Sequence, residues 1–219
     1  TVLEEQLAKF QTTVLPGLPP FQGGAAGLFG YDLGRSLEDL PNTAVQNSNI
    51  PDMAVGIYDQ VIAFDHVKNK AWLIVQAVDG TEGWIKQKDT LKVLNSAYAP
   101  PPFMPVNLNW ESNMDPDAYE EAITRVLDYI YKGEIYQANV AQRFEADVPE
   151  GFQPYAHYLR LREVNPAPHA GYFNLSGAIV SSASPERFVR VNGKAVETQP
   201  IKGTRPRAGS EALDKVYQE

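Results

Sequence analysis

The chain has 219 residues, 43% hydrophobic and 21% charged, so it can bury a sizeable core as one large domain or two small ones. It has no cysteine and three histidines, which excludes a disulfide framework, a thiolate metal site and a cysteine nucleophile and argues against a histidine-rich metal site. A net charge of −8 argues against nucleic acid or an anionic membrane as the main partner, although a local basic cluster can still hold a small anion. No apolar run reaches the roughly 18 residues that a membrane-spanning helix needs, and we expect a cytoplasmic protein.

The N-terminal region predicts strands followed by a helix. Residues 15–30 are rich in proline and glycine, which predicts a loop that leads into a short strand near 28–31. Two runs rich in β-branched and aromatic residues, 53–64 and 71–78, are separated by a polar turn and predict a hairpin. Thr81 then has the side chain to cap the helix that follows.

The prolines at 100–102 and 105 mark the best internal boundary, because proline removes backbone donors and stiffens an extended linker. We therefore divide the chain into two regions, 1–105 and 106–219. We expect both to be incomplete, the first at its start and the second at its end.

The clearest helix lies just after this boundary. Asp115 is a good N-cap, Pro116 suits the first helical position, and the apolar residues that follow repeat at the spacing of one helical face. Gly133 should end the helix. An alternating segment at 136–144 predicts a strand, and a second short helix is expected over 154–162.

The rest of the chain predicts short strands with a hairpin at their end. Asn192-Gly193 is the preferred residue pair for a tight type I′ turn, and this turn would set Val189 opposite Val196. The expected strands are 171–175, 178–182, 187–191 and 194–199.

The run from Gln199 to Arg207 sets one ammonium group and two guanidinium groups beside a backbone freed by glycine. Gly203 lets a ligand approach the main chain closely, and Thr204 offers a hydroxyl group and an amide. Lys202 can act as a point charge or, when it is desolvated, as a nucleophile. Such a run suits a small anion, and the alternative is a solvated basic turn.

Glu186 and Lys202 are the best candidates for chemistry. With a two-residue turn at 192–193, Glu186 lies opposite Gln199, and Lys202 comes three residues later, roughly 10 Å along the strand. Strict alternation would then point the two side chains to opposite faces, so a shared pocket needs a bulge or a twist. The alternative for Glu186 is an exposed carboxylate at the end of a strand.

Three motifs together resemble the chorismate-utilising enzymes, and within them component I of aminodeoxychorismate synthase. They are Pro-Ile-Lys-Gly-Thr-Arg-Pro-Arg (200–207), Ser-Pro-Glu-Arg-Phe (184–188) and Gly-Glu-Ile-Tyr-Gln-Ala-Asn (133–139). The resemblance covers most of the chain. It implies an α+β fold, a layered sandwich of two packed β-sheets flanked by helices as in anthranilate synthase component I. Similar subunits extend beyond both ends of this chain, so we expect it to be the N-terminal-to-middle part of a longer protein.

The resemblance also implies roles for particular residues. Lys202 matches the nucleophile that adds to the chorismate ring as the C4 hydroxyl group leaves, and Glu186 matches a proton donor. Gly203 and Thr204 match positions that hold substrate in the related anthranilate synthase subunit. The segment Pro168-His169-Ala170 matches one that contacts bound tryptophan, although a lone histidine such as His169 in a proline-rich loop is usually an ordinary surface residue.

The implied reaction is the conversion of chorismate and ammonia to 4-amino-4-deoxychorismate, with ammonia from a glutamine amidotransferase partner. The implied cofactor is Mg²⁺, whose ligands we expect beyond residue 219, so no metal ligand is assigned within this chain. One rival is anthranilate synthase component I, which usually carries alanine where Lys202 stands. The rival from another class is a binding module that holds an aromatic amino acid or a partner and catalyses nothing.

Overall fold

The computed structural model describes residues 1–10, 13–42, 50–77, 79–175 and 177–201. Three predicted site residues, Lys202, Gly203 and Thr204, lie outside this described part. The chain forms two compact units, one of which comprises Thr1–Pro100 with the segment from Leu161 onward, while the other is Pro101–Arg160. The division into regions 1–105 and 106–219 stays a prediction.

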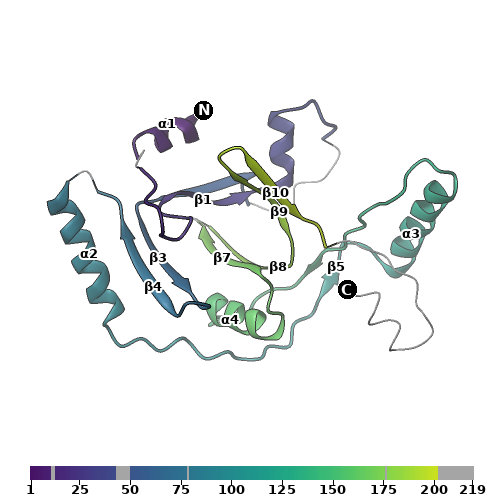
Figure 1. The fold of residues 1–219 in the computed structure, drawn as a ribbon. Coiled ribbons are helices and arrows are strands. Elements are labelled where there is room, and N and C mark those ends of the chain that lie inside the picture. The colour runs from purple at the N-terminus through teal and green to yellow at the C-terminus, as the bar shows by residue number, and fades with distance from the viewer. Residues whose placement is uncertain (11–12, 43–49, 78, 176, 202–219) are drawn as a thin grey trace, which may run out of the picture. The chain divides into compact units, whose positions relative to one another are not determined.

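The described residues combine helices with antiparallel strands, as expected for an α+β protein (Figure 1). The helices are α1 (Val2–Ala8), the 3₁₀ helix η1 (Tyr31–Ser36), α2 (Gly80–Leu94), α3 (Pro116–Tyr131) and α4 (Pro154–Val164). The strands are β1 (Gly24–Phe29), β2 (Met53–Tyr58), β3 (Gln60–Asp65), β4 (Lys70–Val75), β5 (Glu111–Ser112), β6 (Phe144–Glu145), β7 (His169–Leu175), β8 (Ala178–Ser184), β9 (Arg187–Asn192) and β10 (Ala195–Gln199).

Every described strand pairs with one neighbour, in antiparallel orientation. The pairs are β1–β2, β3–β4, β5–β6, β7–β8 and β9–β10. The predicted run 53–64 is interrupted at Asp59, so it contributes to two different pairs, β1–β2 and β3–β4. In these pairs each strand has one edge bonded to its partner, while its other edge has no strand beside it among the described residues.

Glycine allows β1 and β2 to approach each other closely. Gly27 lies opposite Val55, and a Cβ atom at Gly27 would stand only 2.1 Å from the carbonyl oxygen of Ala54. Just beyond the strand, the Gly30 amide donates to the Asp52 carbonyl at 2.6 Å. The glycine-rich segment, predicted mainly as a loop, is therefore strand from Gly24, because the missing side chains let the two backbones pair.

Helix α2 is held by polar contacts at its start and along the side that packs against β4. The Asp79 carboxylate, not the predicted Thr81 hydroxyl, caps the helix by accepting from the Glu82 amide at 2.9 Å. Lys86 Nζ lies 2.7 Å from the Asp59 carboxylate and 2.6 Å from that of Glu82. Hydrogen bonds to these carboxylates raise the pKa of Lys86, Asp59 contributing most.

Helix α3 agrees closely with its prediction, but the strand expected after it is largely absent. Asp115 accepts from the Ala118 amide at 2.7 Å, Pro116 is the first helical residue, and Gly133 adopts a φ of 75° just past the end. The predicted strand 136–144 was wrong for most of its length, since only its last residue belongs to β6. The alternation of apolar and polar residues did not suffice to form a strand here, because a strand also needs a partner whose backbone it can bond.

Few side chains are buried. Among the described residues the buried apolar ones are Ala156 and Tyr158 on α4. Many large apolar side chains elsewhere are exposed, including Phe188 at 89% and Tyr136 at 93%, and others are only half-buried. The strand pairs thus leave apolar surface uncovered, in an amount unusual for a soluble monomer.

We expect Gly27→Ala to destabilise the chain by about 1–3 kcal/mol, because the new methyl group would meet the Ala54 carbonyl, a backbone atom that cannot move without disturbing the pairing. Urea unfolding of the full-length subunit, followed by tryptophan fluorescence, measures the effect. Gly80→Ala is the matched control, since nothing lies within 4 Å of its Cβ position. Equal stability of Gly27→Ala and the unsubstituted chain would show that the close approach is not required.

We also expect the isolated 219-residue chain to associate and to bind a dye that reports exposed apolar surface. The reason is the combination of uncovered apolar side chains and strand edges. Light scattering and dye fluorescence test this directly. A monodisperse monomer with a sharp cooperative melt and no dye binding would contradict the expectation.

Candidate functional site

Glu186 lies in the two-residue link between β8 and β9. Its neighbour Pro185 is also outside both strands, and both residues are exposed. The Ser184 hydroxyl donates to the Glu186 backbone carbonyl at 3.3 Å, which fixes the main chain at this junction. The carboxylate is thus presented at a junction between two strand pairs, β7–β8 and β9–β10.

The pairing of β7 with β8 brings two of the predicted sites together. His169 lies opposite Ser184, and Ala170 lies opposite Ala183. The segment Pro168-His169-Ala170, predicted to contact tryptophan, therefore begins at the same end of the pair from which Glu186 extends. Pro168 is exposed, whereas His169 and Ala170 are half-buried. Proximity to Glu186 could not be read from the sequence, because it depends on the β7–β8 register.

The hairpin β9–β10 exists as predicted, but its turn is shifted by one residue. Asn192 pairs with Ala195, so the two turn residues are Gly193 and Lys194. Gly193 takes a φ of 58°, which favours glycine at this position. The predicted turn at Asn192-Gly193 was therefore wrong, and Val196 faces Val191 instead of Val189.

The register of this hairpin changes once more, between Glu197 and Gln199. Arg190 pairs with Glu197, but Gln199 pairs with Arg187, so two residues of β9 face the single residue Thr198. This is a β-bulge, with Phe188 and Val189 as the two residues on the longer strand. The Thr198 hydroxyl donates to the Phe188 carbonyl at 2.9 Å, across the bulge.

The shifted turn and the bulge together change the expected partner of Glu186. The sequence predicted Gln199 opposite Glu186, whereas the structure sets Gln199 opposite Arg187. Arg187 is paired with the Glu197 carboxylate, and Arg190 lies 4.0 Å from the same carboxylate. Two arginines and one glutamate thus form a charged cluster on one face of the hairpin.

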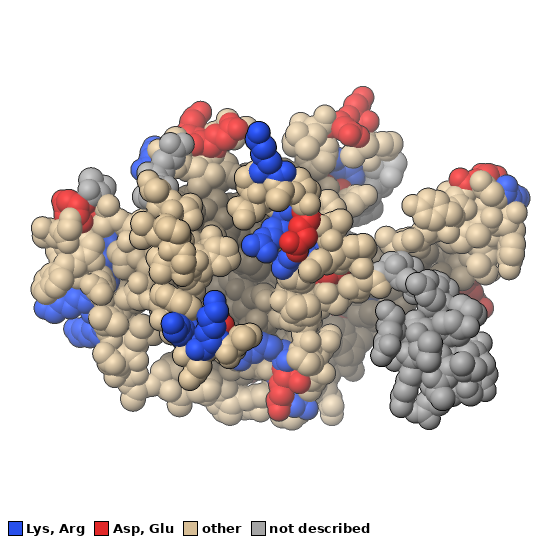
Figure 2. Space-filling view, in the orientation of Figure 1, with Lys and Arg blue, Asp and Glu red and all other residues tan. Residues whose placement is uncertain are grey.

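The described part of the chain contains no group of three or more histidine, aspartate or glutamate side chains that could hold a metal ion. No helix within the same ranges is both long and apolar enough to cross a membrane. Figure 2 shows basic and acidic side chains intermingled over the face in view. This mixture agrees with the net charge, which gave no reason to expect a polyanion surface.

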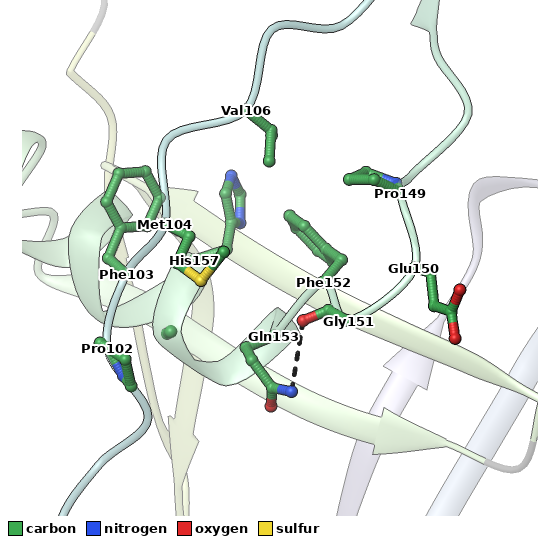
Figure 3. A pocket seen from close by; sticks show the side chains of 11 residues that line it. Pro102, Phe103, Met104, Val106, Pro149, Glu150, Gly151, Phe152, Gln153 and His157 are labelled. Carbon is green, nitrogen blue, oxygen red and sulfur yellow. Dashed lines mark hydrogen bonds between the residues drawn. The ribbon is translucent and has the colours of Figure 1, made fainter.

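A cavity that the sequence analysis missed lies within the unit Pro101–Arg160. It has a volume of about 210 Å³ and is mainly apolar, with the His157 ring beside the Phe152 ring at a centroid distance of 5.8 Å (Figure 3). The Gln153 side chain turns away to donate to the Gly151 carbonyl at 3.4 Å. Its walls come from residues 102–106, the loop 149–153 and the start of α4, and are formed by Pro102, Phe103, Met104, Val106, Pro149, Glu150, Gly151, Phe152, Gln153, Ala156 and His157.

None of the predicted site residues within the described ranges lines this cavity. Its lining contains apolar residues, one histidine and one carboxylate, without a paired acid and nucleophile. The only sequence signals were the apolar residues near the prolines at 102 and 149, and these are equally typical of packing. The candidate functional site therefore remains the junction of the two strand pairs around Glu186.

Comparison with known proteins shows which family the chain belongs to. The sequence profile of the chorismate binding enzymes matches residues 1–219, and the chain therefore belongs to that family. It is 38% identical over 189 residues to aminodeoxychorismate synthase component 1 of Escherichia coli (strain K12), which covers 86% of this chain and 40% of that protein. It is 37% identical over 210 residues to anthranilate synthase component 1 of Thermus thermophilus, which covers 91% of this chain and 43% of that protein.

The fold agrees with a solved structure of the same kind. The crystal structure of anthranilate synthase component I from Streptococcus pneumoniae TIGR4 matches with a TM-score of 0.74 at 24% sequence identity, over 89% of this chain and 46% of that one. The predicted α+β fold of this type is thereby confirmed. The chain spans less than half the length of these relatives.

Proposed function

We propose that this chain is part of component I of an aminodeoxychorismate synthase, which converts chorismate and ammonia to 4-amino-4-deoxychorismate. The observation that carries the proposal is Lys202 within Pro-Ile-Lys-Gly-Thr, in a chain that also carries Glu186 at the junction of two strand pairs. Relatives with this name from two bacteria are 38% and 40% identical to it.

The proposed chemistry uses an acid and a nucleophile. A hydroxyl group leaves poorly unless it is protonated, so the Glu186 carboxyl group gives its proton to the C4 hydroxyl of chorismate, which departs as water. The Lys202 amine, having lost its proton, forms the new C–N bond to the ring. Ammonia then replaces the lysine at the ring, and the proton that it loses on becoming the amino group returns to the Glu186 carboxylate, which releases the product and restores the enzyme. The neighbouring guanidinium groups of Arg205 and Arg207 favour the neutral form of the lysine.

The register of β9 and β10 supports the pairing of these two residues. Gln199 lies opposite Arg187, and one further step of the same register would set Pro200 across from Glu186. Lys202 follows Pro200 by two residues in the sequence. If the chain continues extended beyond Gln199, residues two apart share a face, and this spacing would bring the acid and the nucleophile to the same face. A bulge, one of the two features that would permit a shared pocket, is present in β9.

Gly203 and Thr204 complete the proposed substrate contacts, and Pro168, His169 and Ala170 are proposed to contact bound tryptophan. The described residues offer no set of ligands that fits Mg²⁺, so the cofactor does not enter the steps proposed for this chain. The proposed partner is a glutamine amidotransferase that supplies ammonia, and the cytoplasmic location stays a prediction from composition.

Anthranilate synthase component I is the second candidate, because overall sequence identity hardly separates it from aminodeoxychorismate synthase component I. The Thermus anthranilate synthase relative is 37% identical, close to the 38% of the Escherichia aminodeoxychorismate synthase relative. The residue at position 202 separates them better, since lysine there supplies a nucleophile and alanine does not. A binding module without catalysis remains the alternative from another class.

We expect Lys202→Ala, made in the full-length subunit, to abolish formation of 4-amino-4-deoxychorismate while chorismate still binds through Gly203 and Thr204. A lysine that only paired with a substrate carboxylate would instead weaken binding by about 1–3 kcal/mol and leave the product unchanged. Product analysis and chorismate titration separate the two roles. The mutant could also admit ammonia at the adjacent ring carbon, which would give anthranilate.

Trapping tests the covalent step itself. The unsubstituted subunit is incubated with chorismate in the absence of ammonia, and peptides spanning Val196 to Arg205 are examined by mass spectrometry. An adduct on Lys202 is expected. If no adduct forms, and if Lys202→Ala still makes the amino product at near wild-type kcat, the covalent route is wrong.

The 219-residue chain alone is expected to show no activity. Its described residues hold no cluster suited to a metal ion, and the relatives with the proposed function are more than twice as long as the part that aligns. Chorismate, ammonium and Mg²⁺ are incubated with the purified chain, and the full-length subunit serves as the positive control. Measurable conversion of chorismate by the short chain would refute this expectation.

A further inference from the structure

The bulge in the β9–β10 hairpin separates charged from apolar side chains near the candidate acid. On one face Arg187 and Arg190 both reach the Glu197 carboxylate. On the other face Val191 lies opposite Val196, and both valines are exposed. Arg187 and Arg190 are three residues apart, so strict alternation would put them on opposite faces. Their shared contact with Glu197 is independent support for the extra residue between them.

The Thr198 hydroxyl is the polar group that spans the bulge. A bulge displaces a backbone group from the ladder of hydrogen bonds, and the hydroxyl donates to the Phe188 carbonyl at 2.9 Å. Phe188 itself is 89% exposed, so packing of its side chain does not hold the bulge in place. The hydroxyl of Thr198 and the ion pair of Arg187 with Glu197 are the contacts that favour this register.

We propose that Thr198 is a positioning residue, which stabilises the bulge and so decides which face of the hairpin carries Glu186. The inference rests on the proposed role of Glu186 as the acid. With the bulge, Arg187 shares a face with Arg190, and alternation continued one residue before β9 would place Glu186 on the face of Val191, away from the arginine cluster. Without the bulge, Glu186 would share a face with Arg190 and Glu197.

The difference matters for proton transfer. General acid catalysis requires the carboxyl group to lie within hydrogen-bond reach of the leaving group, so the face of the hairpin that carries Glu186 decides whether it can act on the substrate. Thr198 would therefore act on the reaction through the strand register, without touching the substrate.

The strand register can be measured by disulfide cross-linking, which needs no catalytic activity. The chain has no cysteine that would compete with an introduced pair. We compare two double variants, Val191→Cys with Val196→Cys, which are opposite in both registers, and Phe188→Cys with Gln199→Cys, which are opposite only without the bulge. Directly opposite residues have Cα atoms about 4.5–5.5 Å apart, within the range of a disulfide bond. The first pair should oxidise faster in the unsubstituted background. Adding Thr198→Val should shift the ratio of the two rates toward the second pair by roughly fivefold, as expected for the loss of one hydrogen bond.

Kinetics of the full-length subunit then test the effect on catalysis. Thr198→Val should lower kcat by up to about fivefold and leave KM for chorismate within about twofold, because the acid is misplaced in part of the molecules while the substrate contacts remain. Thr198→Ser keeps the hydroxyl group and should restore most of the lost kcat. The matched control is Thr90→Val, which removes a threonine hydroxyl that donates to Gln60 at 2.5 Å in another part of the fold. It should leave kcat and the cross-linking ratio unchanged.

Glu186→Gln separates failure of this inference from failure of the proposed function. If Glu186→Gln loses activity but Thr198→Val keeps wild-type kcat, the positioning role is wrong and the acid role stands. If Thr198→Val leaves the cross-linking ratio unchanged, Thr198 does not hold the register and the inference is overturned. If Glu186→Gln itself keeps wild-type kcat, the acid role is wrong and the inference falls with it.

Discussion

The candidate site depends on the antiparallel pairing of β7 with β8. This register sets His169 opposite Ser184, and only Pro185 and Glu186 then separate β8 from β9. The link is too short to carry Glu186 far from the end of β8, since two residues span at most about 7 Å. The segment Pro168-His169-Ala170 and the candidate acid Glu186 thus both lie at one end of the β7–β8 pair. The backbone hydrogen bonds between these strands fix this arrangement.

The same pattern of pairing explains why the chain buries so little. Each described strand bonds one neighbour, and the apolar faces of pairs such as β9–β10 lie open. Hydrophobic burial stabilises by roughly 25 cal/mol per Å², so uncovered valine and phenylalanine side chains contribute little while they stay exposed. The backbone pairing nevertheless specifies which residues meet, and the likeness in fold to a solved anthranilate synthase component I persists at 24% identity. The chemistry that we propose needs the longer protein, whereas the geometry around Glu186 is set locally.

Features governed by neighbouring residues were the ones that sequence could predict. The start of α3 follows from Asp115 and Pro116, whose effects act within one helical turn. The turn of the last hairpin was misplaced by one residue, because the preference of Asn192-Gly193 competes with the pairing of Val191 with Val196 and with the bulge at Thr198. The helix cap at Asp79 was missed for a similar reason, since aspartate and threonine are both good caps and the choice depends on where the helix packs. The motif around Glu186 was recognised from sequence, but its closeness to His169 required the strand register. The other half of the predicted site, Lys202 with Gly203 and Thr204, lies outside the described residues.

We propose that the full-length subunit aminates chorismate at C4, with 4-amino-4-deoxychorismate and not anthranilate as its main product. The most direct measurement is the identity of the product that the full-length subunit forms from chorismate and ammonium ions, determined by mass spectrometry and NMR. The lysine at position 202 predicts 4-amino-4-deoxychorismate as the main product. Anthranilate as the main product of the unsubstituted subunit would contradict the account.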